Sequence, residues 1–405
     1  MKENQPKTKR ICLIATAPAL MYVFNRNIIP ALLENGWEVT GLTSKNQPGF
    51  GDDDHYAKLE SLGVRMVPVP TSRDPKPLCD LWCLLRLWWF FLWHRFDVVH
   101  ASNPKTMLIG TLAAFFAFHP NRVITVRGRV YENTRGWKRK IFVWLDRLTC
   151  FLANRVIVVS PSLKEAMLRD KIGTEKTLHV IAQGSSQGCD AEYFNPENIE
   201  QHRVDELRSQ CGLTKTDRVL LFAGRLRKDK GVVKLTQAFA DISPQHPDWH
   251  LVLFGHEENA SDIGDDTRKL IQTHEKIHHF DWLSDLRIAY MMADIFALPT
   301  WREGFPNTVL EASAMRLPVV TTTAVGAVDS VIDGETGFLV PANNAEQLAE
   351  KLQVLMCDPE MRHIMGANGR NRVLSDFQPQ TIQNGLMEIY ENLLYSTSKY
   401  TTERQ

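Results

Sequence analysis

The stretch Arg302-Glu303-Gly304-Phe305-Pro306-Asn307-Thr308-Val309-Leu310-Glu311-Ala312 directly follows the apolar run 295–299. That run is typical of a buried strand, and a Gly-Phe-Pro turn comes after it. Pro306 suits the first helical position, because its missing N–H would have had no partner there and its fixed φ matches the helix. The segment therefore predicts a strand, a tight turn and a helix in succession.

The turn offers a seat for a phosphate, because backbone N–H groups at a helix start favour an anion. The groups that would point beyond the strand belong to Gly304, Phe305 and Asn307. Glu303 and Glu311 would stand up to roughly 12 Å apart on a helix. That span fits a nucleotide diphosphate sugar, with Glu311 on the ribose hydroxyls and Glu303 on the sugar. Without the turn, two glutamates at this spacing would be typical of a solvated helix face.

Short β-rich runs alternate with helical patterns along the rest of the chain. The runs are 11–15, 38–42, 64–67, 97–100, 123–126, 155–159, 218–222, 250–254, 294–298 and 318–321. This alternation predicts parallel sheets with right-handed helical crossovers. We expect an α/β protein with two Rossmann-like, doubly wound domains facing a cleft. The run 11–24 mimics a signal peptide, but Pro18 interrupts it, and a strand with its loop fits better.

The Glu303–Glu311 spacing resembles the E-x(7)-E motif of the family 4 retaining glycosyltransferases, which have the GT-B fold. Other segments match that family in order and spacing over roughly residues 10–340. They are 184–190, 194–196, 221–226 with 230–231, 317–320 and 333–340. The resemblance implies an acceptor-binding domain over 1–205 and a nucleotide-sugar-binding domain over 206–379. It also implies a C-terminal helix and tail over 380–405, with the helix crossing back to the first domain.

The resemblance also assigns roles around the donor. Arg225 and Lys230 follow a strand directly and would neutralise the departing diphosphate in the transition state, alongside Glu303 as the third catalytic residue. Their alternative is a solvated loop of charged residues, as we expect for 227–229. The N–H groups near Thr16 would reach the donor phosphate from the first domain. In this family the leaving phosphate is thought to help deprotonate the acceptor, so we expect no side-chain nucleophile, no metal and no cofactor.

Arg127 stands where many members of the family carry a histidine. This departure, together with Gly128 and Tyr131-Glu132, is similar to the subgroup that builds bacterial surface polysaccharides on a polyprenyl diphosphate carrier. An arginine matches an acceptor diphosphate bidentately. His100, at the end of another strand, is a second candidate for the acceptor side, with a satisfied structural histidine as its alternative. Arg316 replaces a glycine that is usual in the family.

The charges of this 405-residue chain cancel overall but are unevenly placed. Residues 1–190 carry ten more basic than acidic residues, and residues 191–405 carry ten more acidic than basic ones. The basic excess concentrates in 127–147. The run 78–96 is a tryptophan-rich helical pattern in which Asp80 and Arg86 argue against a membrane span. It predicts either a core helix of the first sheet or, with 127–147, a docking surface for an anionic leaflet.

These features predict a transferase that moves a hexose or N-acetylhexosamine from a UDP-linked donor to a lipid-linked saccharide. The expected partners are the nucleotide sugar, a polyprenyl-diphosphate-linked sugar acceptor and an anionic membrane surface, with no nucleic acid. The expected place is cytoplasmic, peripheral on the inner face of the plasma membrane. Seven cysteines without a C-x-x-C pair indicate buried thiols in a reducing compartment.

Three other functions compete with this prediction. A nucleotide-sugar epimerase of the same fold would need no acceptor, which fits a basic, tryptophan-rich first domain poorly. A non-catalytic sugar-nucleotide binder is a weaker alternative, because this chain has both glutamates of the motif and both phosphate-binding cations. Residues 274–278 spell H-E-x-x-H, the signature of a zinc protease. They run straight into 279–282, which is typical of a strand or loop, so we expect no zinc site there.

Overall fold

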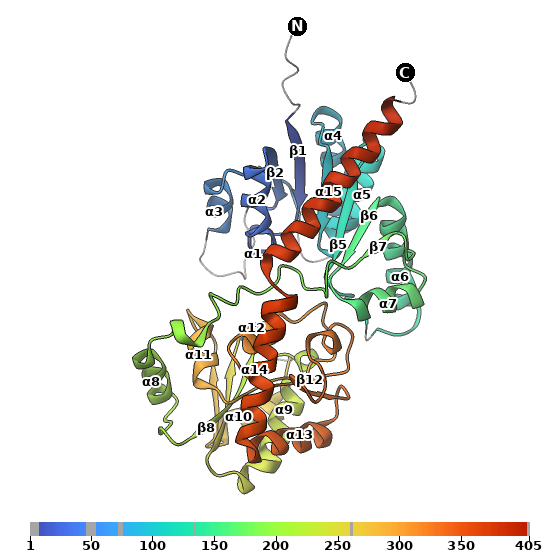
Figure 1. Cartoon of the computed structure of the whole chain (residues 1–405). Coiled ribbons are helices and arrows are strands. Elements are labelled where there is room, and N and C mark those ends of the chain that lie inside the picture. The colour runs from blue at the N-terminus through green and yellow to red at the C-terminus, as the bar shows by residue number, and fades with distance from the viewer. Residues whose placement is uncertain (1–7, 46–53, 72–75, 133, 260–261, 403–405) are drawn as a thin grey trace. The chain divides into compact units, whose positions relative to one another are not determined.

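The computed structural model describes residues 8–45, 54–71, 76–132, 134–259 and 262–402 (Figure 1). Contacts divide the chain into two compact units. The first comprises the residues up to Gln187 together with those from Pro379 onward, and the second comprises Gly188–Gln378. This division places 188–205 in the second unit and keeps the last helix with the first.

The first unit contains a seven-stranded parallel sheet in the order β3-β2-β1-β4-β5-β6-β7. Its strands are β1 (Lys9–Ile14), β2 (Trp37–Thr43), β3 (Arg65–Pro68), β4 (Val98–Ser102), β5 (Arg122–Val126), β6 (Arg155–Val158) and β7 (Leu178–His179). The chain runs from β1 to β3 in one direction and from β4 to β7 in the other. The sheet is therefore doubly wound, with its switch point between β1 and β4.

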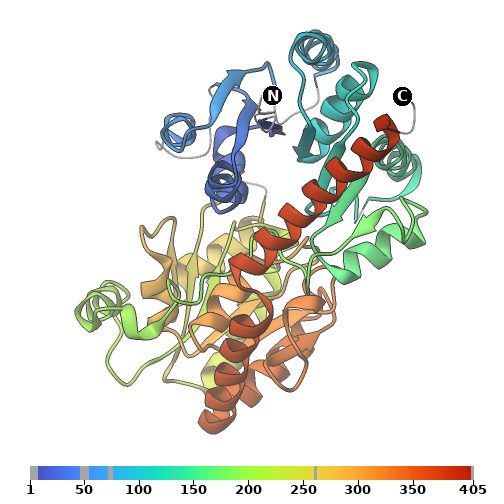
Figure 2. The ribbon, with the colours of Figure 1, turned by 45° about the horizontal axis from the view of Figure 1, so that its top comes forward.

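Eight helices are described in this unit. They are α1 (Pro18–Asn25), α2 (Ile28–Glu34), α3 (His55–Ser61), α4 (Pro77–Trp93), α5 (Pro104–Phe116), α6 (Gly136–Leu152), α7 (Pro161–Arg169) and α15 (Pro379–Thr402). Right-handed crossovers put α1–α3 on one face of the sheet and α4–α6 on the other. The helix α15 runs obliquely across the unit (Figure 2), where Tyr390 and Leu393 pack with Ile11, Trp37 and other core residues.

The second unit repeats this plan around a six-stranded parallel sheet in the order β10-β9-β8-β11-β12-β13. Its strands are β8 (Arg218–Ala223), β9 (Trp249–Phe254), β10 (Ile277–Phe280), β11 (Ile295–Leu298), β12 (Val319–Thr322) and β13 (Gly337–Val340). Its α-helices are α8 (Gln201–Gln210), α9 (Val232–Ile242), α10 (Asp265–Thr273), α11 (Leu286–Met292), α12 (Asn307–Ala314), α13 (Ala345–Cys357) and α14 (Pro359–Asp376). The buried apolar side chains of its strands and helices form one contiguous cluster.

The expectation of two doubly wound α/β units is confirmed. Every predicted strand run is a strand whose ends lie within two residues of the expected ends. The run 11–24 forms most of β1, an inner strand of its sheet, and most of α1. The structure adds β7, β10 and β13, which are short and lie at sheet edges. Their residues are only partly buried, and β7 and β10 lack the continuous apolar run by which an inner strand is recognised.

The cysteines differ in part from expectation. Five thiols are buried, whereas Cys79 and Cys357 are exposed. Across the described ranges, no helix combines the length and the apolar character that crossing a membrane requires.

Candidate functional site

The carboxyl ends of β8, β9, β11 and β12 meet at one edge of the second sheet, because the strands are parallel. The loops that leave this edge carry most of the predicted donor residues. Arg225 and Lys230 follow β8, and Glu303 follows β11. A Cβ on Gly231, whose φ is +82°, would overlap with the carbonyl oxygen of Pro299. The two loops can therefore approach this closely because position 231 has no side chain.

Lys230 and Glu303 form an ion pair between the ammonium Nζ and the carboxylate Oε1. Their side chains are 18% and 13% exposed, so the pair is shielded from most solvent screening. The sequence put both residues at the donor, and the fold brings them into contact. An anionic group placed beside this pair would meet a cation that already has one carboxylate partner.

The rest of the loop after β8 is an ion-pair network rather than the solvated loop expected for 227–229. Arg225 and Arg227 both contact the carboxylate of Glu258, at 3.0 and 3.3 Å. Asp229 pairs with Arg227 at 3.1 Å and with Arg302 at 3.0 Å. Burial opposes ionisation of Asp229, but the hydrogen bond from Arg302 and the charge of Arg227 outweigh it and lower its pKa. The network ties the loops after β8, β9 and β11 together.

The helix α12 begins one residue later than expected. Pro306 is its N-cap, with φ −80° and ψ 105°, and Asn307 is the first helical residue. A backbone hydrogen bond holds the turn before this helix in place, because the N–H of Glu303 donates to Val325 O at 3.1 Å. The Oδ1 atom of Asn307 is buried and has no hydrogen-bond partner within the described residues. A buried amide oxygen without a partner is costly, so a ligand hydroxyl or amide donor would satisfy it.

Glu311 lies further along α12 and accepts a hydrogen bond from the hydroxyl of Tyr290, at 2.9 Å from Oε2. Tyr290 is buried on α11, and burial followed by the charge of Glu311 raises its pKa well above the ordinary value. Tyr290 therefore remains a neutral donor that orients the carboxylate. Gly304, Phe305, Asn307 and Glu311 all belong to this one turn and helix, as predicted from the sequence.

Arg127, the predicted acceptor residue, follows β5 in the first unit. Its guanidinium carbon lies 4.2 Å from the ring centroid of Phe24. Its Nε and Nη1 atoms are buried and lack a hydrogen-bond partner among the residues that the structure describes. Burial lowers the pKa of Arg127 to about 10, against a smaller opposite effect of Tyr390. The group still carries a charge at neutral pH, so a nearby anion would stabilise it strongly.

His100 is 5% exposed. Its Nδ1 lies 2.7 Å from the Tyr390 hydroxyl, and its Nε2 lies 2.8 Å from the Thr125 hydroxyl. Burial and the charge of Arg127 lower its pKa to about 3. With both ring nitrogens occupied, the geometry favours the structural alternative for this histidine.

Thr16 lies in the loop between β1 and α1, and its backbone N–H and carbonyl groups already have hydrogen-bond partners. Its N–H donates to Asn103 Oδ1 at 3.4 Å, and its carbonyl accepts from the hydroxyls of Ser44 and Thr71 at 3.0 Å each. The long, weak bond to Asn103 is the contact that a phosphate could replace.

The H-E-x-x-H pentapeptide does not form a zinc-binding helix. The helix α10 ends at Thr273, His274 is its C-cap, and His278 belongs to β10. His278 stacks on His250, with 2.9 Å between ring nitrogens. Within the described part of the chain, no group of three or more His, Cys, Asp or Glu side chains is placed to hold a metal ion.

The backbone conformation at Arg316 accounts for the glycine that is usual at this position. This residue follows the C-cap of α12 with φ +62°, where glycine is normally favoured. Its N–H and that of Leu317 donate to Ser313 O and Ala312 O, both at 3.0 Å. The arginine therefore occupies a left-handed turn position, and its side chain contacts Glu197 at 3.1 Å.

The tryptophan-rich helix α4 combines features of both expected readings. It packs on the rest of the unit through Cys83, Leu87 and Phe91, which repeat at helical spacing. Most of its other apolar side chains are exposed, including Trp89 at 60% and Trp93 at 71%. The neighbouring α5 and α6 add more exposed aromatic residues. These are Phe115, Phe116, Trp137, Phe142, Trp144 and Phe151.

Several residues of the site escaped the sequence analysis. Tyr290 and Glu258 stand in no recognisable motif, and only the fold brings them to Glu311 and to Arg225. The Asn307 side chain adds an acceptor where only its N–H was expected. Strand ends that share a sheet edge were the one available signal for Glu258, which follows β9.

Two family models match this chain. The model described as glycosyl transferases group 1 matches residues 203–372, and the model described as glycosyltransferase family 4 matches residues 23–184. Together they span most of both units. The matches give no support to an epimerase or to a zinc protease.

Known proteins resemble the chain over most of its length. A capsular polysaccharide biosynthesis glycosyltransferase, CapM of Staphylococcus aureus, is 32% identical over 80% of this chain and 84% of its own. A UDP-Gal:α-D-GlcNAc-diphosphoundecaprenol α-1,3-galactosyltransferase of Escherichia coli is 25% identical over 82% and 84%. The crystal structure of Anabaena HepE in complex with UDP-glucose has the same fold, with TM-score 0.75 and 19% identity over 95% of this chain and 99% of that one.

Proposed function

This chain belongs to the family 4, group 1 glycosyltransferases, and from that premise we propose that it moves a hexose or N-acetylhexosamine from a UDP-sugar to a polyprenyl-diphosphate-linked saccharide. Transfer would proceed with retention of the anomeric configuration, as the family implies. The relatives support both substrates, since the similar Escherichia coli enzyme is named for a UDP-sugar donor and a diphosphoundecaprenol acceptor. The product would contribute to a bacterial surface polysaccharide, as the similarity to CapM suggests.

The observation that carries the donor side is the cluster at the carboxyl edge of the second sheet. Lys230 and Arg225 supply cations, and the first N–H groups of α12 supply partial positive charge, where a diphosphate would leave. Charge on the leaving group grows in the transition state, so these groups would stabilise it more than the ground state. Glu303 would bind the sugar, and Glu311, oriented by Tyr290, would bind the ribose. Thr16 would add a contact from the first unit.

Arg127 would bind the acceptor diphosphate. Its guanidinium has buried nitrogen atoms without a partner among the described residues, and it stacks on Phe24. A diphosphate could receive two parallel N–H···O bonds from it. His100 would then act through Arg127 and Tyr390 as a positioning residue rather than touch the acceptor.

A lipid-linked acceptor brings the enzyme to a bilayer, and we assign the docking surface to α4, α5 and α6. These helices form one layer, since α5 contacts both neighbours. They expose tryptophan and phenylalanine side chains, and α6 adds Lys138, Arg139 and Lys140. Aromatic rings suit the interface, and basic residues suit anionic headgroups. The enzyme would work in the cytoplasm, on the inner face of the plasma membrane.

Incubation of the purified chain with UDP-hexoses and a short-chain polyprenyl diphosphate bearing one N-acetylhexosamine tests this function. We expect a disaccharide product whose new linkage has the configuration of the donor, measured by NMR. Release of an epimerised UDP-sugar without transfer would instead support the epimerase alternative. An inverted linkage would contradict the retaining reaction.

A further inference from the structure

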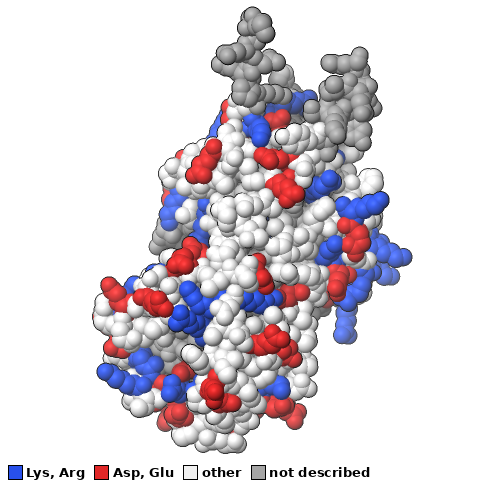
Figure 3. Space-filling model, in the orientation of Figure 1, with Lys and Arg blue, Asp and Glu red and all other residues white. Residues whose placement is uncertain are grey.

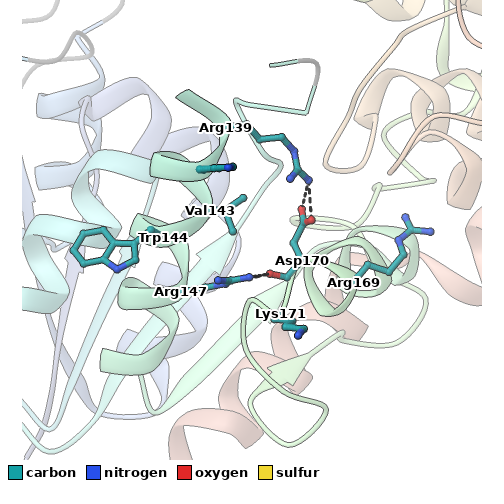
Figure 4. A pocket seen from close by; sticks show the side chains of 8 residues that line it. Arg139, Val143, Trp144, Arg147, Arg169, Asp170 and Lys171 are labelled. Atoms are coloured by element: carbon teal, nitrogen blue, oxygen red, sulfur yellow. Dashed lines mark hydrogen bonds and ion pairs between the residues drawn. The ribbon is translucent and has the colours of Figure 1, made fainter. Parts of the chain in front are cut away.

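A pocket of about 530 Å³ lies between α6 and the end of α7 in the first unit. Its lining contains five cations and one carboxylate. The residues are Arg139, Lys140, Val143, Trp144, Arg147, Arg169, Asp170 and Lys171 (Figure 4). In Figure 3 a group of Lys and Arg side chains covers the edge of this unit where Figure 1 places α6 and α7. None of these residues has a part in the transfer reaction proposed above.

The one carboxylate in the pocket is already occupied. Asp170 pairs with the buried Arg129 and with Arg139, both at 2.6 Å. Arg147 donates to the backbone carbonyl of Asp170 at 2.6 Å (Figure 4). These bonds hold Arg139 and Arg147 in place in the lining of the pocket. The positive charge that remains has no compensating side chain inside the pocket.

Lys140, Arg169 and Lys171 have exposed side chains without an ion-pair partner in the described part of the chain. Gathering like charges around one hollow costs free energy through repulsion, which a bound anion would remove. Lysines and arginines arranged in this way match the oxygens of a phosphate group.

Lys171 adds an independent observation. It follows the C-cap of α7 with φ +56°, a left-handed position that glycine occupies without strain. Its N–H donates to Leu168 O at 2.9 Å, and that of Ile172 donates to Met167 O at 2.9 Å. A lysine therefore occupies a position where the backbone favours glycine, and this lysine lines the pocket.

We propose that this pocket binds the phosphate group of an anionic membrane lipid. The inference rests on the membrane attachment proposed above and names its headgroup site. The surroundings favour a lipid over a soluble phosphate, because Trp144 lines the pocket and Trp137 and Phe151 are exposed on the same helix. Interfacial tryptophans lie at the level of the headgroups, where lipid phosphates are found.

Vesicle sedimentation at fixed ionic strength tests the pocket with three lipid compositions. They are neutral phosphatidylcholine, and phosphatidylserine and phosphatidic acid mixtures matched in surface charge. We expect the wild type to bind phosphatidic acid most tightly, because its phosphomonoester is the most accessible phosphate. Lys140→Gln/Arg169→Gln should weaken that binding about 25-fold, since each cation near an anionic surface contributes about fivefold. The control Lys58→Gln/Arg65→Gln removes the same charge from α3 and β3, at the other edge of the sheet, and should bind as the wild type does.

The Lys171→Gly variant separates an effect of pocket charge on lipid binding from an effect on the stability of the fold. It removes one cation and relieves the left-handed strain, so we expect a higher Tm together with weaker binding to phosphatidic acid. Arg316→Gly is its matched control, because it makes the same backbone and charge change in the second unit and should raise Tm without changing vesicle binding. A fold defect therefore cannot imitate the expected result.

The outcomes distinguish the pocket from the wider proposal. Wild-type binding that the pocket variants leave unchanged would overturn the pocket site and leave membrane attachment intact. Inorganic phosphate that displaces the protein from vesicles at low millimolar concentration would show a site for soluble phosphate and overturn the lipid assignment. Failure of the wild type to bind any vesicle would overturn both.

Discussion

Lys230 and Glu303 are two residues that the sequence assigned separately to the donor and that the structure joins in one ion pair. A diphosphate beside Lys230 would place two anionic groups around one ammonium. Glu303 would then be free to turn its other oxygen toward a sugar hydroxyl. The pair therefore links sugar binding to leaving-group stabilisation, and its two members should not act independently.

Glu303→Gln keeps the shape of the side chain and removes its charge. We expect turnover to fall by about 10²-fold, near 3 kcal/mol of barrier. Lys230→Gln should lower kcat more than it raises the donor KM, because leaving-group charge is greatest in the transition state. Initial-rate kinetics on both variants and on the double variant measure the coupling. Additive losses, or full turnover in a folded Glu303→Gln enzyme, would contradict this role for the pair.

His100 makes stability depend on pH in a direction that the structure defines. Its folded pKa of about 3 lies below the ordinary value of 6.5, so the folded state binds fewer protons. The stability linked to neutral His100 is present above pH 6.5 and is lost as pH falls toward 3, by about 1.4 kcal/mol per pH unit. His100→Gln cannot titrate, so its deficit against the wild type should shrink between pH 7.5 and 5.

Urea unfolding at several pH values measures that difference, and other titrating groups cancel in the comparison. The matched control is His363→Gln, which replaces an exposed histidine on α14. A gap between wild type and His100→Gln that stays constant with pH would show that His100 is not held neutral.

At the scale of elements, the inner strands follow from the sequence because burial on both faces leaves continuous apolar runs. The helix after β11 follows from the Gly-Phe-Pro turn that precedes it. The edge strands β7 and β10 do not follow, since they are short and lack such runs, whereas the edge strand β3 was expected at 64–67. The Gly304–Glu311 segment was placed because its residues are local in sequence. Tyr290 and Glu258 were missed because they reach the site from other elements through tertiary contacts. The start of α12 shifted by one residue because Pro306 takes an extended ψ as N-cap.

The helix α4 gives a prediction that separates its two faces. Leu87 is buried, so Leu87→Ala should destabilise the protein by about 2–5 kcal/mol. Trp89→Gln/Trp93→Gln changes exposed residues and should leave stability within about 1 kcal/mol, while weakening sedimentation with anionic vesicles. Thermal unfolding and sedimentation on the same samples make the comparison. A double tryptophan variant that binds vesicles normally would remove α4 from the docking surface.

For the whole molecule, the uneven distribution of charge agrees with the proposal that the first unit binds the acceptor and the membrane and the second unit binds the donor. The basic excess lies in residues 1–190, which contain Arg127 and the pocket beside α6, and the acidic excess lies in the remainder. In the second unit, the cations that would face the donor are paired with nearby carboxylates in the loop after β8. These cations therefore act locally, although the unit as a whole is acidic. Charge that steers the enzyme to an anionic surface is thus separated in sequence from charge that acts on the donor.

Catalysis by this chain should survive chelation. The positive charge facing the diphosphate would come from Arg225, Lys230 and the N–H groups at the start of α12, so the leaving group would not depend on a divalent ion. Transfer assayed after EDTA treatment and desalting should keep most of the wild-type rate, and added Mg²⁺ or Mn²⁺ should change it little. Circular dichroism on the same samples controls for unfolding. A folded enzyme that loses transfer with EDTA and regains it with a divalent ion would show that a metal carries part of the charge assigned to Arg225 and Lys230.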